Sequence, residues 1–228
     1  MQPLQLISKY AICYGIFFLL TYITKLNDGN KFFDQKGIVR NPGALAGLQI
    51  AGILWFGFIP ANIFDESFIS MVFGNHLPGL LKMSVLIMLV MNAIILSSTQ
   101  SENEFIRIVT QKANNIFITR GFAYRYFIFR IVFLIAYEAW FRGYLLTDCV
   151  TAFGIPLAIF INVSLYTILH SFSGRKEIIG CIPFGILLCT LCTWFGAAWP
   201  AIIMHVALAF TYEYKLADKF LNPKNILA

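Results

Sequence analysis

Charged residues are scarce in this chain, and their scarcity excludes an ordinary water-soluble globule. Only 12% of the 228 residues are Asp, Glu, Lys or Arg, whereas 59% are hydrophobic, and the mean hydropathy is +0.74. A chain with so few polar side chains cannot cover a soluble core with hydrophilic surface. The composition therefore predicts an integral membrane protein.

The strict alternation of apolar and polar residues that is typical of a membrane β-barrel is also missing. Long runs of Leu, Ile, Val and Phe take its place and favour α-helical spans. Runs long enough to cross about 30 Å of hydrocarbon occupy residues 6–24, 43–64, 77–98, 124–149, 151–170, 178–196 and 198–216. We therefore expect an all-α fold, a polytopic bundle of about seven transmembrane helices.

Internal repeats and low-complexity tracts are absent, so residues 1–228 are expected to form a single structural domain. Within it, residues 1–123 hold three spans and a cytoplasmic or interfacial segment, and residues 124–216 hold the motifs described below. In the segment 99–121, charged and apolar residues alternate. This pattern predicts a short amphipathic helix at the membrane interface.

Basic residues are absent from every second connection between the apolar runs, which bears on orientation and partners. The other connections and the C-terminal tail hold Lys25, Lys31, Lys36, Arg40, Arg107, Lys112, Arg120, Arg175, Lys176, Lys215, Lys219 and Lys224. The opposite side offers only Lys9. This bias predicts an N-terminus outside and a C-terminus in the cytoplasm. The net charge of +6 is thereby explained without nucleic acid, and membrane lipid is the expected partner.

The chain lacks a second cysteine pair that could complete a zinc or redox site with Cys189-Thr-Leu-Cys192. All five cysteines lie in or beside apolar runs. We interpret them as small buried hydrophobic residues.

Four ionisable side chains stand out in the C-terminal half, because a charge inside an apolar run costs roughly 2.5–3.5 kcal/mol on insertion scales. They are Glu138, Arg142, His170 and His205. Glu138 and Arg142 are four residues apart and share one face of a helix. Intramembrane charges usually face a polar cavity or a partner, so these residues are the candidate functional site.

Two chemistries can use this set. A carboxylate and an imidazole that share a water form a general base for hydrolysis, with the second imidazole stabilising the oxyanion. Alternatively, two histidines and Glu138 can bind zinc and leave a fourth position for water. The chain lacks the His-Glu-x-x-His spacing typical of zinc peptidases, so we expect no metal or other cofactor.

Each polar residue also has a purely structural interpretation. A single membrane histidine is more often an interhelical hydrogen-bonding residue than a catalyst. Arg125 and Arg130 are expected to extend towards the cytoplasmic interface without a chemical role. Asn92 and Asn162 are expected to hydrogen-bond between helices.

In combination, Glu138-x-x-x-Arg142, Tyr166-x-x-x-His170 and a late His205 resemble a known family. They look like the motifs of the CAAX protease and bacteriocin-processing (CPBP) family of intramembrane glutamic endopeptidases, which includes the Ras-converting enzyme. The similarity covers the motif-bearing part of the chain defined above. It implies a multi-pass protein of the bacterial inner membrane that cuts a peptide or membrane-protein substrate.

In that family, the motifs are Glu-Glu-x-x-x-Arg, Phe-x-x-x-His and His-x-x-x-Asn or Asp. The resemblance implies that the first Glu and His170 activate water, while His205 and the Asn hold the oxyanion. Here the first Glu falls on Tyr137 and the Asn falls on Ala209. The phenol of Tyr137, with an ordinary pKa of about 10, is no base at neutral pH.

Two interpretations remain open. In one, Glu138 acts as the base, or Glu177 does so within Gly174-Arg175-Lys176-Glu177, a stretch that resembles a Gly-basic-x-x-Glu-like element of single-Glu relatives. Glu213 then supplies a late carboxylate. In the other, the chain is a pseudoprotease that binds a partner without cutting it. Glu138 would then only pair with Arg142, and Glu177 and Glu213 would be solvated at helix ends.

The expected spans also place the candidate residues at different depths. Glu138 falls in the middle of the membrane, His205 in its outer part and His170 near the cytoplasmic end. Tilted or shorter helices are needed to bring the three together.

Overall fold

Long helices make up almost all of the chain that the computed structural model describes, namely residues 3–27, 32–34, 37–38, 41–63, 67–75, 77–110, 119–172 and 174–222. In chain order the helical elements are α1 (Pro3–Leu26), α2 (Pro42–Gly52), η1 (Ile53–Phe58), α3 (Ile59–Ile63), α4 (Phe68–Phe73), α5 (Leu80–Thr110), α6 (Arg120–Glu138), η2 (Ala139–Leu145), α7 (Leu146–Phe153), α8 (Ile155–Leu169), η3 (His170–Phe172), α9 (Arg175–Phe195) and α10 (Trp199–Leu221). A minimal hairpin of β1 (Phe33–Asp34) and β2 (Gly37–Ile38) follows α1. The prediction of an all-α fold is confirmed.

Every apolar run singled out in the sequence coincides with a helical segment. Four of the described helical segments are long and apolar enough to cross a membrane, which supports the prediction of an integral membrane protein. They are Pro42–Asn62, Leu80–Thr110, Ile155–Phe172 and Arg175–Phe195. The count of seven spans stays a prediction.

Prolines mark helix starts where the sequence indicates them. Pro42 is the first residue of α2, and the side chain of Asn41 caps this helix by accepting a hydrogen bond from the backbone N–H of Ala44 at 3.0 Å. Pro156 and Pro200 likewise lie in the first turns of α8 and α10. A proline at these positions removes no helical hydrogen bond, because the first N–H groups have no intrahelical partner.

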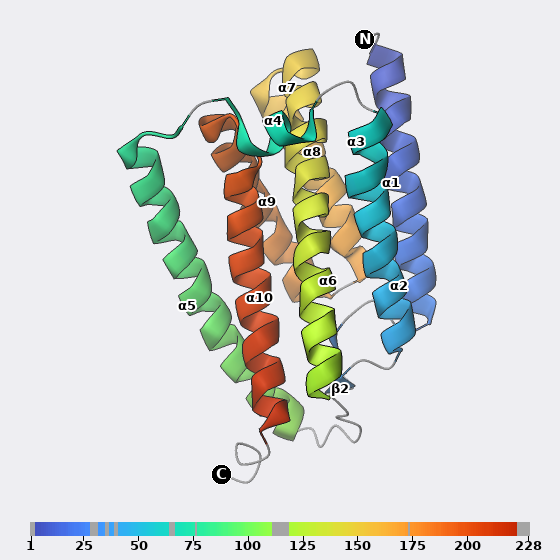
Figure 1. The fold of residues 1–228 in the computed structure, drawn as a ribbon, viewed down its shortest axis with the longest axis vertical. Helices are drawn as coiled ribbons and strands as arrows, with labels where there is room; N and C mark the ends of the chain where they lie inside the picture. Colours follow the sequence, from blue (N-terminus) through green and yellow to red (C-terminus); the bar gives the residue numbers. More distant parts are fainter. Residues whose placement is uncertain are drawn as a thin grey trace.

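The helices form a bundle in which α6 and α10 lie next to each other in the middle (Figure 1). α5 stands at one edge and packs along α10, whereas α1 and α2 lie at the opposite edge. α8 and α9 lie behind α6 and α10 in this view. α1 begins at one end of the bundle and α10 ends at the other.

The contact between α2 and α6 depends on Gly52. A Cβ atom at this position would lie 2.2 Å from the ring of Phe133 on α6. The two helices therefore approach as closely as they do only because position 52 carries no side chain. Phe17 and Phe56 complete this aromatic contact, with ring centroids 4.4 Å apart.

The expected amphipathic helix at 99–121 is wrong for its described part. Residues 99–110 continue α5 without a break, and residues 111–118 lie outside the described residues. Phe105 is buried and its ring centroid lies 5.1 Å from that of Phe220 on α10. Glu102 pairs with Lys219 on the same partner helix. The alternation of charge and apolar residues thus reflects packing of α5 on α10, not a separate surface helix.

The two asparagines behave differently. Asn162 is buried, donates to the backbone carbonyl of Phe141 at 2.6 Å and accepts from the thiol of Cys189 at 3.3 Å, which confirms the interhelical prediction. For Asn92 the prediction is wrong, because this exposed side chain donates to the carbonyl of Met88 in its own helix. All five cysteines are free and buried, as expected.

Lys82 is a further basic residue, which lies inside the apolar run 77–98 and not in a connection between runs. It lies in the first turn of α5 and donates to the carbonyl of Trp194 at 2.5 Å, at the end of α9. A lysine at a helix C-terminus stabilises the unpaired carbonyls there. Lys82 therefore has a local structural role at the end of the bundle where α5 begins.

Candidate functional site

The helix changes its geometry at the first candidate residue. α6 ends at Glu138, and the next seven residues, Ala139–Leu145, form a π-helical segment that contains Arg142. Such wide turns are rare and occur frequently at functional sites. Every side chain from Tyr137 to Leu146 is buried.

Glu138 faces the interior of the bundle and has two charged or polar partners. Its carboxylate accepts a hydrogen bond from Nη1 of Arg142, which lies 3.2 Å from Oε2 and 3.3 Å from Oε1. Nδ1 of His205, on α10, lies 2.5 Å from Oε1. The side chains of Glu138 and Arg142 are both fully buried. The pair therefore extends to a second helix, α10, and is more than a contact within one turn.

The contact with Glu138 determines which nitrogen of His205 can act as a base. An ionised carboxylate only accepts hydrogen bonds, so we assign the imidazole proton to Nδ1. Nε2 then carries the lone pair and can take a proton from a reacting group. Glu138 and His205 thus form a carboxylate–imidazole pair in which the carboxylate orients the ring.

His170 follows the last α-helical residue of α8 and is partly exposed. Its Nδ1 lies 2.9 Å from the backbone carbonyl oxygen of Tyr166. A carbonyl cannot donate, so Nδ1 carries the proton here as well, and Nε2 of His170 is the basic nitrogen. The site therefore contains two imidazoles, each with its Nδ1 held by the protein.

The ring of Tyr166 joins the two histidines to Arg142. The guanidinium carbon of Arg142 lies 4.4 Å from the Tyr166 ring centroid, and the His170 ring centroid lies 4.5 Å from it. The ring centroid of His205 lies 6.2 Å from that of Tyr166. Three of the residues carried over from the family motifs thus lie around one aromatic ring, and Glu138 is bonded to Arg142 and His205 among them.

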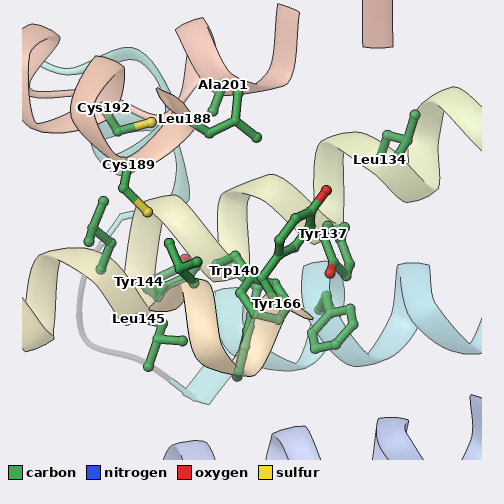
Figure 2. Packing of buried hydrophobic residues seen from close by; sticks show 14 of the residues in the cluster. Leu134, Tyr137, Trp140, Tyr144, Leu145, Tyr166, Leu188, Cys189, Cys192 and Ala201 are labelled. Carbon is green, nitrogen blue, oxygen red and sulfur yellow. The ribbon is translucent and has the colours of Figure 1, made fainter. Parts of the chain in front are cut away.

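Tyr137 belongs to the aromatic packing of this region. Its ring centroid lies 4.6 Å from that of Phe141 and 6.2 Å from that of Tyr166. Figure 2 shows Tyr137, Trp140 and Tyr166 in one packed cluster. The hydroxyl of Tyr137 is buried and has no hydrogen-bond partner among the described residues. Ala209 is also buried, so neither position supplies an acid or an amide.

Glu213 is not solvated at a helix end, which corrects one structural interpretation. Its carboxylate accepts from Nη2 of Arg130 at 3.0 Å, from Nε of Arg130 at 3.3 Å and from the hydroxyl of Tyr126 at 2.8 Å. Its side chain is only 13% exposed. The expectation that Arg130 extends freely to the interface is wrong for the same reason. Arg125 is exposed, and its Nε donates to the carbonyl of Gly121.

Glu177 lies in the first turn of α9 and is exposed, as expected for a residue at a helix end. It acts electrostatically on His170, Arg130 and Tyr212. The start of α9 therefore lies near the Arg130–Glu213 pair and close to His170. Both His170 and His205 lie beside Tyr166, although the expected spans placed the two histidines at different depths.

The sequence analysis missed the grouping of Tyr126, Arg130 and Glu213 as one cluster. A signal was present, since Arg130 precedes Glu138 by eight residues and Glu213 follows His205 by eight residues. If the two helices run antiparallel and Glu138 contacts His205, this equal spacing places Arg130 beside Glu213.

The polar atoms of the site are only partly paired. Oε1 of Glu138 is bonded to Arg142 and His205, Oε2 lies 3.2 Å from Nη1 of Arg142, and the Nδ1 atoms of both histidines have partners, whereas their Nε2 atoms carry the lone pairs. Among the described residues, no group of three or more His, Cys, Asp or Glu side chains is arranged to hold a metal. The expectation of a reaction without a metal stays a prediction.

Comparison with known proteins gives one match. Residues 117–211 match a family described as type II CAAX prenyl endopeptidase Rce1-like. No curated protein and no solved structure matches the chain. The matched residues span η2 and contain Glu138, Arg142, His170 and His205, so the family assignment made from the motifs is confirmed over this part of the chain.

Proposed function

Because residues 117–211 belong to the Rce1-like family of type II CAAX prenyl endopeptidases, we propose that this membrane protein hydrolyses a peptide bond within the bilayer. The observation that carries the proposal is the contact of 2.5 Å between Nδ1 of His205 and the carboxylate of Glu138. It gives the site a base that is oriented for proton transfer. The substrate class is a peptide or a membrane protein that reaches the site from the lipid or the interface.

In the proposed reaction, Nε2 of His205 takes a proton from water while the water oxygen adds to the carbonyl carbon of the scissile bond. Glu138 accepts the Nδ1–H hydrogen bond and stabilises the imidazolium that forms. The imidazolium then gives its proton to the leaving nitrogen, the C–N bond breaks, and the products are a carboxylic acid and an amine. Arg142 holds Glu138 in place through the ion pair.

This assignment differs from the roles that the family resemblance implies. There, the glutamate and His170 activate water and His205 holds the oxyanion. The contacts favour His205 as the base, because Glu138 is bonded to His205 and the Nδ1 of His170 is bonded to a backbone carbonyl instead. His170 Nε2 is the second proton acceptor and lies nearer to the exposed surface of the site.

The test is cleavage of membrane-anchored peptides by the full-length protein in lipid bilayers, with products identified by mass spectrometry. We expect the wild type to release fragments cut at a defined bond. A double variant, His170→Ala with His205→Ala, is expected to release none, since it lacks both imidazoles. Exposed Asn92→Ala serves as the matched control and is expected to cut like the wild type. Equal cleavage by the double variant would refute the peptidase proposal.

Metal dependence is a separate prediction. The purified full-length protein is expected to contain far less than one zinc ion per chain, and a chelator is expected to leave peptide cleavage unchanged. The reason is that no group of three or more His, Cys, Asp or Glu side chains among the described residues is arranged to hold a metal, and that Glu138 is already paired with Arg142 and His205. The measurement is elemental analysis alongside the cleavage assay. Stoichiometric zinc whose removal abolishes cleavage would contradict it.

A specific observation supports a second candidate function, a pseudoprotease that binds a membrane partner. Tyr137 and Ala209 occupy the positions of a glutamate and an asparagine in the family motifs, and both are buried in apolar packing. In this case the wild type cuts no peptide, and a partner co-purifies in a fixed ratio from mild detergent. Recovery of no such partner counts against it.

Our proposal for the topology is seven spans with the N-terminus outside and the C-terminus in the cytoplasm of a bacterial inner membrane. Its support is that α1 begins and α10 ends at opposite ends of the bundle (Figure 1), as an odd number of crossings requires. Described basic residues lie in the last turns of α1, α5 and α10, namely Lys25, Arg107 and Lys219, and these helix ends share one end of the bundle (Figure 1), which is the distribution typical of a cytoplasmic face.

A further inference from the structure

We propose that Arg130 and Glu213, with Tyr126, form a clamp that sets the position of His205 against Glu138; the three are positioning residues. The inference deepens the proposed function, because it concerns the same site. Its basis is that one pair of helices, α6 and α10, carries both the Glu138–His205 contact and the Arg130–Glu213 ion pair. No family motif stated above includes any residue of the clamp.

The spacing of the two contacts makes them interdependent. Arg130 lies eight residues before Glu138 on α6, and Glu213 lies eight residues after His205 on α10. Both stretches are regular α-helix, so both contacts are separated by about 12 Å along each axis, at 1.5 Å per residue. A slip of α10 by one turn, about 5.4 Å, would break both at once. The Arg130–Glu213 pair can therefore fix the helix register that the Glu138–His205 contact needs.

The geometry of the Arg130–Glu213 pair suits this role. Arg130 presents Nε and Nη2 to the two oxygens of Glu213, at 3.3 and 3.0 Å, which is a two-pronged arrangement that restricts rotation as well as distance. The hydroxyl of Tyr126 adds a third bond to the same carboxylate. The exposed fractions of the two charged side chains are 24% and 13%, so water weakens the pair less than it would on an open surface.

The contact between Glu138 and His205 has little tolerance for movement. Nδ1 of His205 is 2.5 Å from the carboxylate, and a displacement of about 1 Å in an active site can lower a rate by about 10²-fold. Losing the clamp should therefore affect the chemical step more than substrate binding. A contribution to stability alone would not produce that separation.

The first test is kinetic and uses Glu213→Gln and Arg130→Met in the full-length protein in bilayers. We expect kcat for peptide cleavage to fall by about 10- to 100-fold with KM little changed. Arg130→Lys keeps the charge but loses the second prong, so its kcat should be intermediate. The exchanged pair, Arg130→Glu with Glu213→Arg, should recover much of the loss. The matched control is Glu102→Gln, which removes an ion pair of α10 with α5 and should leave kcat unchanged.

The second test does not require activity and separates this inference from the proposed function. A short His–carboxylate hydrogen bond gives a low-field imidazole N–H proton signal in NMR spectra, assigned by its loss in Glu138→Gln. We expect the signal in the wild type and in Glu102→Gln, its shift or loss in Glu213→Gln, and its return in the exchanged pair.

The clamp is refuted if folded Glu213→Gln and Arg130→Met proteins keep the wild-type signal. It is equally refuted if the exchanged pair folds without restoring the signal, or if the wild type lacks it. A wild type that shows the signal but cuts no peptide would overturn the proposed function and leave the NMR comparison to decide on the clamp.

Discussion

Replacing His205 by alanine is expected to lower kcat for peptide cleavage by about 10²–10⁴-fold, the usual contribution of a general base. The reason is that His205 is the imidazole whose Nδ1 is bonded to Glu138, at 2.5 Å. The measurement is single-turnover cleavage of a membrane-anchored peptide by the full-length protein. KM should change little, because the side chain acts in the transition state and not in binding.

The matched comparison is His170→Ala, which removes an imidazole from the same site. Its Nδ1 is bonded to the carbonyl of Tyr166 and not to a carboxylate, so no charged group supports its protonation in the same way. We expect a smaller loss of kcat than for His205→Ala. A larger loss in His170→Ala would reverse the two roles and restore the assignment that the family resemblance implies.

Replacing Glu138 by alanine is expected to lower the free energy of unfolding by about 3–5 kcal/mol, the typical effect of removing one partner of a buried ion pair. Arg142 is fully buried and Nη1 bonds to Glu138, while its Nε and Nη2 have no hydrogen-bond partner among the described residues. The variant therefore leaves an uncompensated cation in the core. Chemical unfolding of the protein in detergent, followed by circular dichroism, measures the change.

The control for this prediction is the double variant Glu138→Ala with Arg142→Met. Removing both charges leaves two apolar side chains and no uncompensated cation in the core. The free energy of unfolding of the double variant should therefore be higher than that of Glu138→Ala alone, although the double variant cuts no peptide. A single variant as stable as the wild type would show that Arg142 finds another partner.

Much of the architecture could be predicted from the sequence because the apolar runs are long and proline marks their starts. The spacing of Glu138 and Arg142 predicted their pairing correctly, since residues four apart share a helix face. These inferences depend on local geometry alone.

The remaining features depend on how the helices pack. In a uniformly apolar run no periodicity tells which face turns inwards, so Asn92 and Asn162 look alike in sequence although one is exposed and the other buried. Arg130 resembles an interfacial arginine until Glu213, 83 residues away, is brought to it. The partner of Glu138 on α10 is likewise a consequence of tertiary packing.

The π-helical segment Ala139–Leu145 makes the length of this part of the chain a constraint in its own right. On one side of it, Glu138 is bonded to His205; on the other, Asp148 accepts a hydrogen bond from Tyr10 on α1 at 2.6 Å. A π-turn holds one more residue than an α-turn, so deleting one residue here would let the segment close into a regular α-helix with its two sides still in register. Inserting a further residue has no such outlet and would turn the two sides by about 100° relative to each other, so one of the two bonds would be lost. The segment therefore accommodates a deletion more readily than an insertion.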